Sequence, residues 1–190
     1  MPESDFKEGH VEADGFRVRY LEAGQGDSVV ILDSTAWGWS PLNDALAKTY
    51  RVVVFEVPGM GSSSPNTTSG SVNDLAGTMV QAAASVVSGK FTLIGTSFAA
   101  NVALRQTLLA PESVEALVLI SPTAIRPAAS APTQTLDEMK ARLSAHPENI
   151  PSLPFGLIDN LTQEQALAAR LGGTVNDSEL ESRLGDVQCA

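Results

Sequence analysis

The fold is decided by the stretch Phe91-Thr92-Leu93-Ile94-Gly95-Thr96-Ser97-Phe98-Ala99. Its first four residues form an apolar run typical of a strand, and a run typical of a helix follows at residues 101–110. Gly95 and Ala99 are small residues two positions before and after Ser97, so they permit a very tight turn that pushes the serine hydroxyl into solvent. The spacing predicts a strand, a sharp turn centred on Ser97 and then a helix.

Three further continuous apolar runs flank this stretch, at residues 29–32, 52–55 and 116–120. Continuous apolar runs are typical of parallel strands that are covered on both faces of a sheet. Two alternating stretches open the chain, near residues 11–13 and 16–21, and Asp14-Gly15 between them is a strong hairpin signal. The sequence therefore predicts a mostly parallel sheet with an N-terminal antiparallel hairpin.

Helix start signals lie between these strands. Ser40 before Pro41 is typical of an N-cap and first helical residue, and Ser71 followed by Asp74 resembles a capping box. The second of these helices is expected to end near Gly89. Strands that alternate with helices predict an α/β fold with a doubly wound sheet.

The segment after Pro122 has a different character. It is rich in Ala and Pro from residue 123 to 132, and three short helices are expected to begin at Thr135, Thr162 and Asn176. We interpret residues 1–122 as the α/β core and 123–185 as an inserted helical lid. Residues 186–190 are interpreted as the start of a further core segment that is absent here.

Composition limits the classes of partner. The chain has 190 residues, 43% of them hydrophobic, and a formal net charge of -10. Nucleic acids and anionic membrane surfaces require clustered Lys and Arg, so neither is expected as a partner. Cys189 is the single cysteine, and the polar N-terminus lacks the pattern of a secretory signal. A cytoplasmic location is the expectation.

The chain resembles the α/β-hydrolase family in the order of its motifs: the hairpin, the turn at residues 56–63, the strand–turn–helix around Ser97 and the helices after Ser121-Pro122. In that family such a turn is a nucleophile elbow. The resemblance implies that Ser97 is the nucleophile, and that the backbone N–H groups of Phe98 and Thr35 form the oxyanion hole. This chain has Asp33-Ser34 where family members commonly have His-Gly, so the hole could instead use a neighbour such as Ala36.

The resemblance leaves the other candidate residues with two interpretations each. Trp37 and Met139 are candidates for substrate binding, although large apolar residues near a loop are more often simply packed. His146 is interpreted as an exposed loop residue rather than the general base, and His10, which is expected to lie before the first strand, is no better a candidate. Glu56 is interpreted as a carboxylate that stabilises its turn rather than one that faces the site. No metal site, phosphate loop or cofactor is expected.

In the family, a catalytic acid and a histidine follow the nucleophile in the chain. Neither is recognisable after Ser97, so we expect both to lie on sequence not present here. The strand at residues 116–120 would then form a sheet edge, to be paired by a second chain or by a copy of this one. Two hypotheses follow: a serine hydrolase of small ester-like or C–C substrates, and a non-catalytic protein of the same fold that binds a ligand or partner.

Overall fold

The computed structural model describes residues 5–34, 36, 38–125, 138, 141, 145, 146, 148, 157–173 and 176–189. Thr35, Trp37 and Met139, which the sequence suggested for the oxyanion hole and for substrate binding, lie outside the described residues. So does Thr135, where the first helix of the expected lid was predicted to begin.

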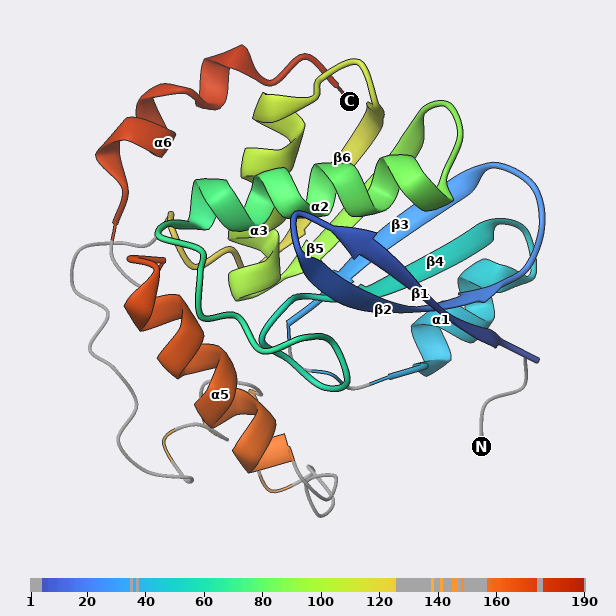
Figure 1. Ribbon diagram of the computed structural model, residues 1–190, viewed down its shortest axis with the longest axis horizontal. Coiled ribbons are helices and arrows are strands. Elements are labelled where there is room, and N and C mark those ends of the chain that lie inside the picture. The colour runs from blue at the N-terminus through green and yellow to red at the C-terminus, as the bar shows by residue number, and fades with distance from the viewer. Residues whose placement is uncertain are drawn as a thin grey trace.

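Six strands form one mixed sheet in the order β1-β2-β4-β3-β5-β6 (Figure 1). Their bounds are β1 (Lys7–Ala13), β2 (Phe16–Ala23), β3 (Ser28–Asp33), β4 (Arg51–Glu56), β5 (Phe91–Thr96) and β6 (Val114–Ile120). β2 pairs antiparallel with both β1 and β4, whereas β4, β3, β5 and β6 are mutually parallel. The predicted fold class is confirmed: an α/β sheet that begins with an antiparallel hairpin.

The hairpin turn has the backbone that its sequence demands. Asp14 and Gly15 have φ values of 50° and 79°. Positive φ at both central residues is the requirement of a type I′ turn, whose twist matches that of the flanking strands. Asp and Gly tolerate this region better than other residues, which explains why this dipeptide marks the hairpin.

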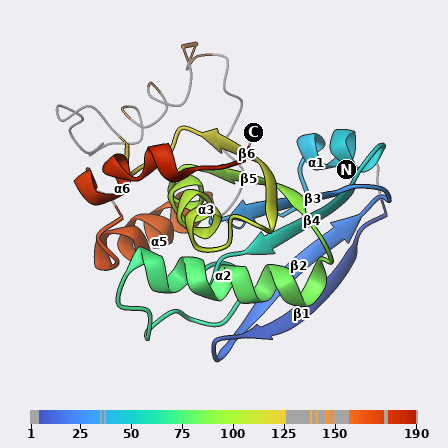
Figure 2. The same ribbon diagram turned by 90° about the horizontal axis from the view of Figure 1, so that it is seen from above.

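Helices cover both faces of the sheet. The elements are α1 (Pro41–Ala47), α2 (Val72–Val86), α3 (Phe98–Leu109), α5 (Leu157–Arg170), α6 (Ser178–Ser182) and a 3₁₀ helix at Leu184–Asp186. Figure 2 shows α2 and α3 on one face of the sheet and α1 on the other. The main core lies between the sheet and the α2–α3 layer. No helix in the described part of the chain is long and apolar enough to cross a membrane.

Helix caps follow the predicted residues in the first half of the chain. The hydroxyl oxygens of Ser40 and Ser71 accept hydrogen bonds from the backbone N–H groups of Asn43 and Asp74. The helix after Ser71 ends at Val86, three residues before the glycine that was expected to stop it.

The helices after Pro122 begin at other residues than expected. α5 starts at Leu157, so Thr162 lies inside the helix and does not cap it. α6 starts at Ser178 and its N-cap is Asp177, whose side chain accepts from Leu180 N–H. The hydrogen bond from Leu180 N–H, and after it the one from Arg105, lowers the pKa of Asp177. The bond from Arg105, which lies in α3, also ties α6 to α3.

β6 is the last strand of the sheet that the described residues form, so one of its edges is free to pair with another chain. It pairs only with β5 among the described residues, and Val118 and Ile120 are 42% and 41% exposed. An apolar parallel edge gains hydrogen bonds and buries these side chains only by acquiring a neighbour. We expect concentration-dependent self-association in light scattering, weakened by Val118→Lys. A monomer at high concentration would contradict this expectation.

Candidate active site

The turn at Ser97 has the strained backbone expected of a nucleophile elbow. Ser97 has φ 55° and ψ −121°, a region that costs a non-glycine residue of order 1–3 kcal/mol. Two hydrogen bonds hold it there: Ser97 N–H donates to the Ile120 carbonyl (2.9 Å), and Thr123 N–H donates to the Ser97 carbonyl (3.3 Å). A Cβ at Gly95 would lie 2.6 Å from the Ala99 carbonyl oxygen. The predicted geometry of this turn is confirmed.

The Ser97 hydroxyl faces a carboxylate. The turn was expected to push Oγ into solvent, but Oγ donates a hydrogen bond to Glu164 Oε1 at 3.1 Å. The Ser34 hydroxyl, at the end of β3, donates to the other oxygen of the same carboxylate, Oε2. Glu164 is only 5% exposed and Ser34 only 2%. One buried carboxylate of α5 therefore joins the loop after β3 to the turn after β5.

The rest of α5 fixes that carboxylate in place. Glu164, Leu167, Ala168 and Leu171 are all buried and follow one another at helical spacing, so they form a single stripe against the core. At the end of the helix, Arg170 donates to the backbone carbonyls of Ser69 and Asn66, each at 2.7 Å.

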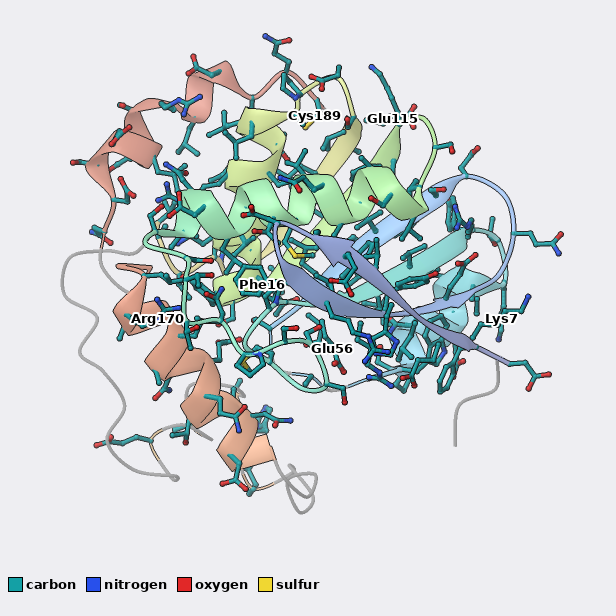
Figure 3. All side chains as sticks on the ribbon, in the orientation of Figure 1. Lys7, Phe16, Glu56, Glu115, Arg170 and Cys189 are labelled. Carbon is teal, nitrogen blue, oxygen red and sulfur yellow. The ribbon has the colours of Figure 1, made fainter. Side chains whose placement is uncertain are left out.

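Figure 3 labels Arg170 on α5. A charge-assisted pair of bonds from one guanidinium fixes orientation as well as distance. The helix is thus anchored both by apolar packing and by Arg170.

Glu56 holds the turn that follows β4 and has no described contact with Ser97. Its Oε2 accepts from Ser62 N–H at 2.8 Å, and its Oε1 accepts from the Arg19 guanidinium. A Cβ at Gly61, where φ is 54°, would lie 2.5 Å from Glu56 Oε2 and 2.8 Å from Ala36 Cβ. The interpretation of Glu56 as a turn-stabilising carboxylate is confirmed.

Phe98 and the two histidines occupy clear positions. Phe98 opens α3, so its backbone N–H has no carbonyl partner within the helix, as an oxyanion donor requires, while its side chain is buried in the core. His146 is 73% exposed, and its Nδ1 lies 3.1 Å from Glu148 Oε1. His10 was expected before the first strand but lies inside β1, which begins at Lys7, and three strands separate β1 from β5. Neither position suits a base for Ser97.

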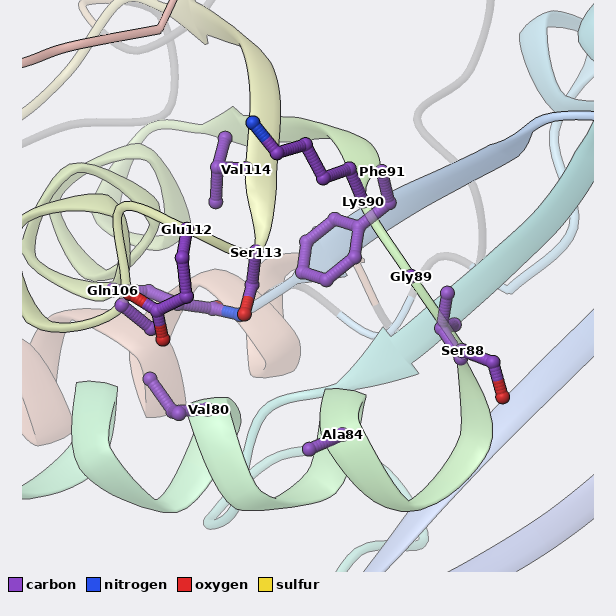
Figure 4. Close-up of a pocket in the computed structure, with 12 residues that line it drawn as sticks. Val80, Ala84, Ser88, Gly89, Lys90, Phe91, Gln106, Glu112, Ser113 and Val114 are labelled. Atoms are coloured by element: carbon purple, nitrogen blue, oxygen red, sulfur yellow. The ribbon is translucent and has the colours of Figure 1, made fainter.

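A surface cavity of about 380 Å³ lies at the opposite end of β5 from Ser97. Its lining comes from the ends of α2 and α3 and the starts of β5 and β6, and includes Lys90, Phe91, Gln106, Glu112 and Ser113 (Figure 4). Ligands of open α/β sheets bind outside the carboxyl ends of the strands, which is where Ser97 lies and this cavity does not. Within the described residues, no group of three or more His, Cys, Asp or Glu side chains could hold a metal ion.

Two residues of this site were missed from the sequence. Glu164 was unassigned, although it occupies one position of an otherwise apolar stripe on α5, and a polar residue at a buried position is an informative signal. Ser34 was noted only as a departure from His-Gly, and its hydroxyl was given no role. Their contact is identified only when α5 is placed against the core.

Known proteins resemble this chain in sequence. A model described as the alpha/beta hydrolase family matches residues 24–183. The chain is 33% identical over 113 residues to a 2-hydroxy-6-oxononadienedioate/2-hydroxy-6-oxononatrienedioate hydrolase of Escherichia coli, covering 55% of this chain and 39% of that protein. It is 30% identical over 119 residues to the dihydrolipoyllysine-residue acetyltransferase component of the acetoin cleaving system of Cupriavidus necator, covering 58% of this chain and 31% of that protein. The chain thus spans between about a third and two fifths of the length of these relatives.

Solved structures agree with the fold. A serine hydrolase involved in carbazole degradation superposes with a TM-score of 0.73 at 20% identity, covering 97% of this chain and 77% of that one. The N-formylmaleamic acid deformylase of Pseudomonas putida S16 superposes with a TM-score of 0.70 at 19% identity, covering 96% of this chain and 79% of that one. Because the family model matches residues 24–183, which are most of this chain, and the strained turn at Ser97 is in place, this chain belongs to the alpha/beta hydrolase family.

Proposed function

We propose that this chain carries the nucleophile of a serine hydrolase acting on a small ester-like or C–C substrate, and that the nucleophile is Ser97. The observation that carries the proposal is the backbone of Ser97, at φ 55° and ψ −121° between a parallel strand and a helix. Strain of this kind persists only where surrounding structure enforces it, and it clusters at active sites. The hydrolase names of the E. coli relative and of both structural neighbours support the reaction class.

In the proposed reaction, Ser97 Oγ attacks the carbonyl carbon of the substrate. The Oγ–C bond forms, the carbonyl π electrons move to oxygen, and the hydroxyl proton passes to a base. The bond to the leaving group then breaks as the base returns the proton to that group. Water next adds to the acyl carbon, the Oγ–C bond breaks, and the acid is released as the water's proton restores the Ser97 hydroxyl. Phe98 N–H, at the start of α3, is proposed as one oxyanion donor.

The base and the acid are proposed to lie outside these 190 residues. A histidine must come within hydrogen-bond reach of Oγ to take its proton, and the observed positions of His10 and His146 do not support either as that group. α5 and α6 are proposed to belong to a lid over the site, because α5 brings a buried side chain to Ser97.

A fluorophosphonate probe tests the nucleophile. Attack by Oγ on phosphorus expels fluoride and leaves a stable adduct whose position mass spectrometry identifies. We expect slow labelling of the purified chain at Ser97, lost in Ser97→Ala and unchanged in Ser85→Ala, which removes an exposed hydroxyl of α2. An adduct that persists in Ser97→Ala, or none on Ser97 in the parent chain, would favour the non-catalytic alternative.

A further inference from the structure

The Glu164 carboxylate occupies the position that a substrate carbonyl would have to take beside Ser97 Oγ. An attacking oxygen and a carbonyl carbon react from a separation of about 3–3.5 Å. Glu164 Oε1 already lies 3.1 Å from Ser97 Oγ. A substrate carbonyl at reacting distance and this carboxylate therefore compete for the same space beside Oγ.

The carboxylate also resembles the group that it excludes. A carboxylate has one trigonal carbon with two oxygens, as does the acid released by hydrolysis of an ester. Here one oxygen faces the Ser97 hydroxyl and the other accepts a hydrogen bond from the Ser34 hydroxyl. In the acyl group of a substrate, the oxygen directed at Ser34 would be the carbonyl oxygen, which becomes negative when Ser97 attacks.

Because Ser34 is buried, its hydroxyl needs an acceptor, and the substrate carbonyl oxygen can be that acceptor. Ser34 is only 2% exposed, so its hydroxyl would lose its partner if Glu164 moved away and nothing replaced it. A buried donor without a partner destabilises the structure because it has lost its water and gained no acceptor. A substrate oxygen in the vacated place would restore the hydrogen bond.

We propose that the Ser34 hydroxyl and Ser97 Oγ flank one site for a substrate carbonyl, where Ser34 donates to the oxygen that becomes negative as Oγ bonds to the carbon. Glu164 fills this site in this structure, and substrate displaces it. The inference rests on the proposed function of Ser97 and adds to it a side-chain oxyanion donor at the position where family members commonly carry glycine. Ser34 contacts the reacting oxygen, and Glu164 acts as an internal competitor held by α5.

Phenylboronic acid is the probe, because its adduct imitates the tetrahedral intermediate without needing a histidine. The Ser97 O–H bond breaks, an Oγ–B bond forms, the proton passes to water, and boron becomes tetrahedral and negative. Calorimetry measures the affinity, and ¹¹B NMR shows whether the boron is tetrahedral.

Glu164→Gln is expected to bind the probe at least tenfold more tightly than the parent chain. The amide removes the charge that repels the boronate and weakens the charge-assisted bonds that hold the competitor. Glu181→Gln, at an exposed glutamate of α6, is the matched control and should leave the affinity unchanged. Unchanged or weaker binding in Glu164→Gln, with circular dichroism showing a folded chain, would overturn the displacement.

The role of Ser34 is tested in the Glu164→Gln background. In the parent chain, Ser34→Ala would also remove the bond that holds the Glu164 carboxylate in the site, and this would obscure the effect on the probe. Adding Ser34→Ala is expected to weaken binding by about 10- to 100-fold, the range for a hydrogen bond to a charged group. Adding Ser34→Thr, which keeps a hydroxyl, should cost much less. Equal affinities with alanine and serine at this position would overturn the role of Ser34, as would absence of boronate binding in every variant.

The same experiment separates this inference from the proposed function. Boronate binding that survives Ser97→Ala would show that the boron is held elsewhere, and Ser97 would lose its assignment as the nucleophile. Binding that depends on Ser97 but not on Ser34 or Glu164 would leave the nucleophile in place and refute only the inference.

Discussion

The purified 190-residue chain is expected to hydrolyse p-nitrophenyl acetate about 10⁴- to 10⁶-fold more slowly than an ordinary esterase. Because neither His10 nor His146 is placed to reach Ser97, its hydroxyl has no histidine to take its proton as it attacks. Only binding and oxyanion stabilisation remain, and such residual contributions are small beside those of a complete catalytic group. Initial rates, corrected with the Ser97→Ala chain, measure the deficit.

Turnover at an ordinary esterase rate, abolished by Ser97→Ala, would contradict this expectation. A base would then exist within residues 1–190, and two variants would identify it. Loss of activity in His146→Ala would assign the histidine, although it is 73% exposed in the structure. Loss in Glu164→Gln would assign the carboxylate that already accepts the Ser97 proton in a hydrogen bond.

The core of the fold was predictable because its signals are local. Gly95 and Ala99 report the tight turn from within five residues, and Asp14-Gly15 reports the hairpin by the positive φ that both residues adopt. The buried strands can be recognised in the sequence as continuous apolar runs, because both of their faces are covered. Each of these signals depends on neighbours in the chain and not on distant contacts.

The site was less predictable because its central contact is distant in sequence. Glu164 is separated by 67 residues from Ser97 and by 130 from Ser34. Only the apolar spacing of Leu167, Ala168 and Leu171 suggests that it is buried, and its partners are known only once α5 packs against the core. The start of α5 was misplaced for a related reason: Thr162 with Gln165 matches a capping box, but the helix continues through it from Leu157.

Replacing Glu56 by alanine is expected to lower the free energy of unfolding by about 3 kcal/mol. Glu56 is 4% exposed, and its removal leaves Ser62 N–H and one side of the Arg19 guanidinium without their acceptor. The value lies at the low end for a broken buried ion pair because Arg19 keeps its bond to Glu8, at 2.9 Å. Urea denaturation followed by circular dichroism measures the change.

Glu8→Ala is the matched control, since it removes the other carboxylate on the same guanidinium. The Arg19 hydrogen bond lowers the pKa of Glu8, but this carboxylate is solvent-exposed and its bond is screened by water. Its loss should therefore shift the urea midpoint far less than the loss of Glu56. Glu56 braces the turn at Ser62, whereas Glu8 lies in β1 of the outer hairpin. Equal shifts of the urea midpoint in the two variants would mean that the turn does not depend on the buried carboxylate. The loop at Ala36, which packs against Gly61 of that turn, would then owe its position to other contacts.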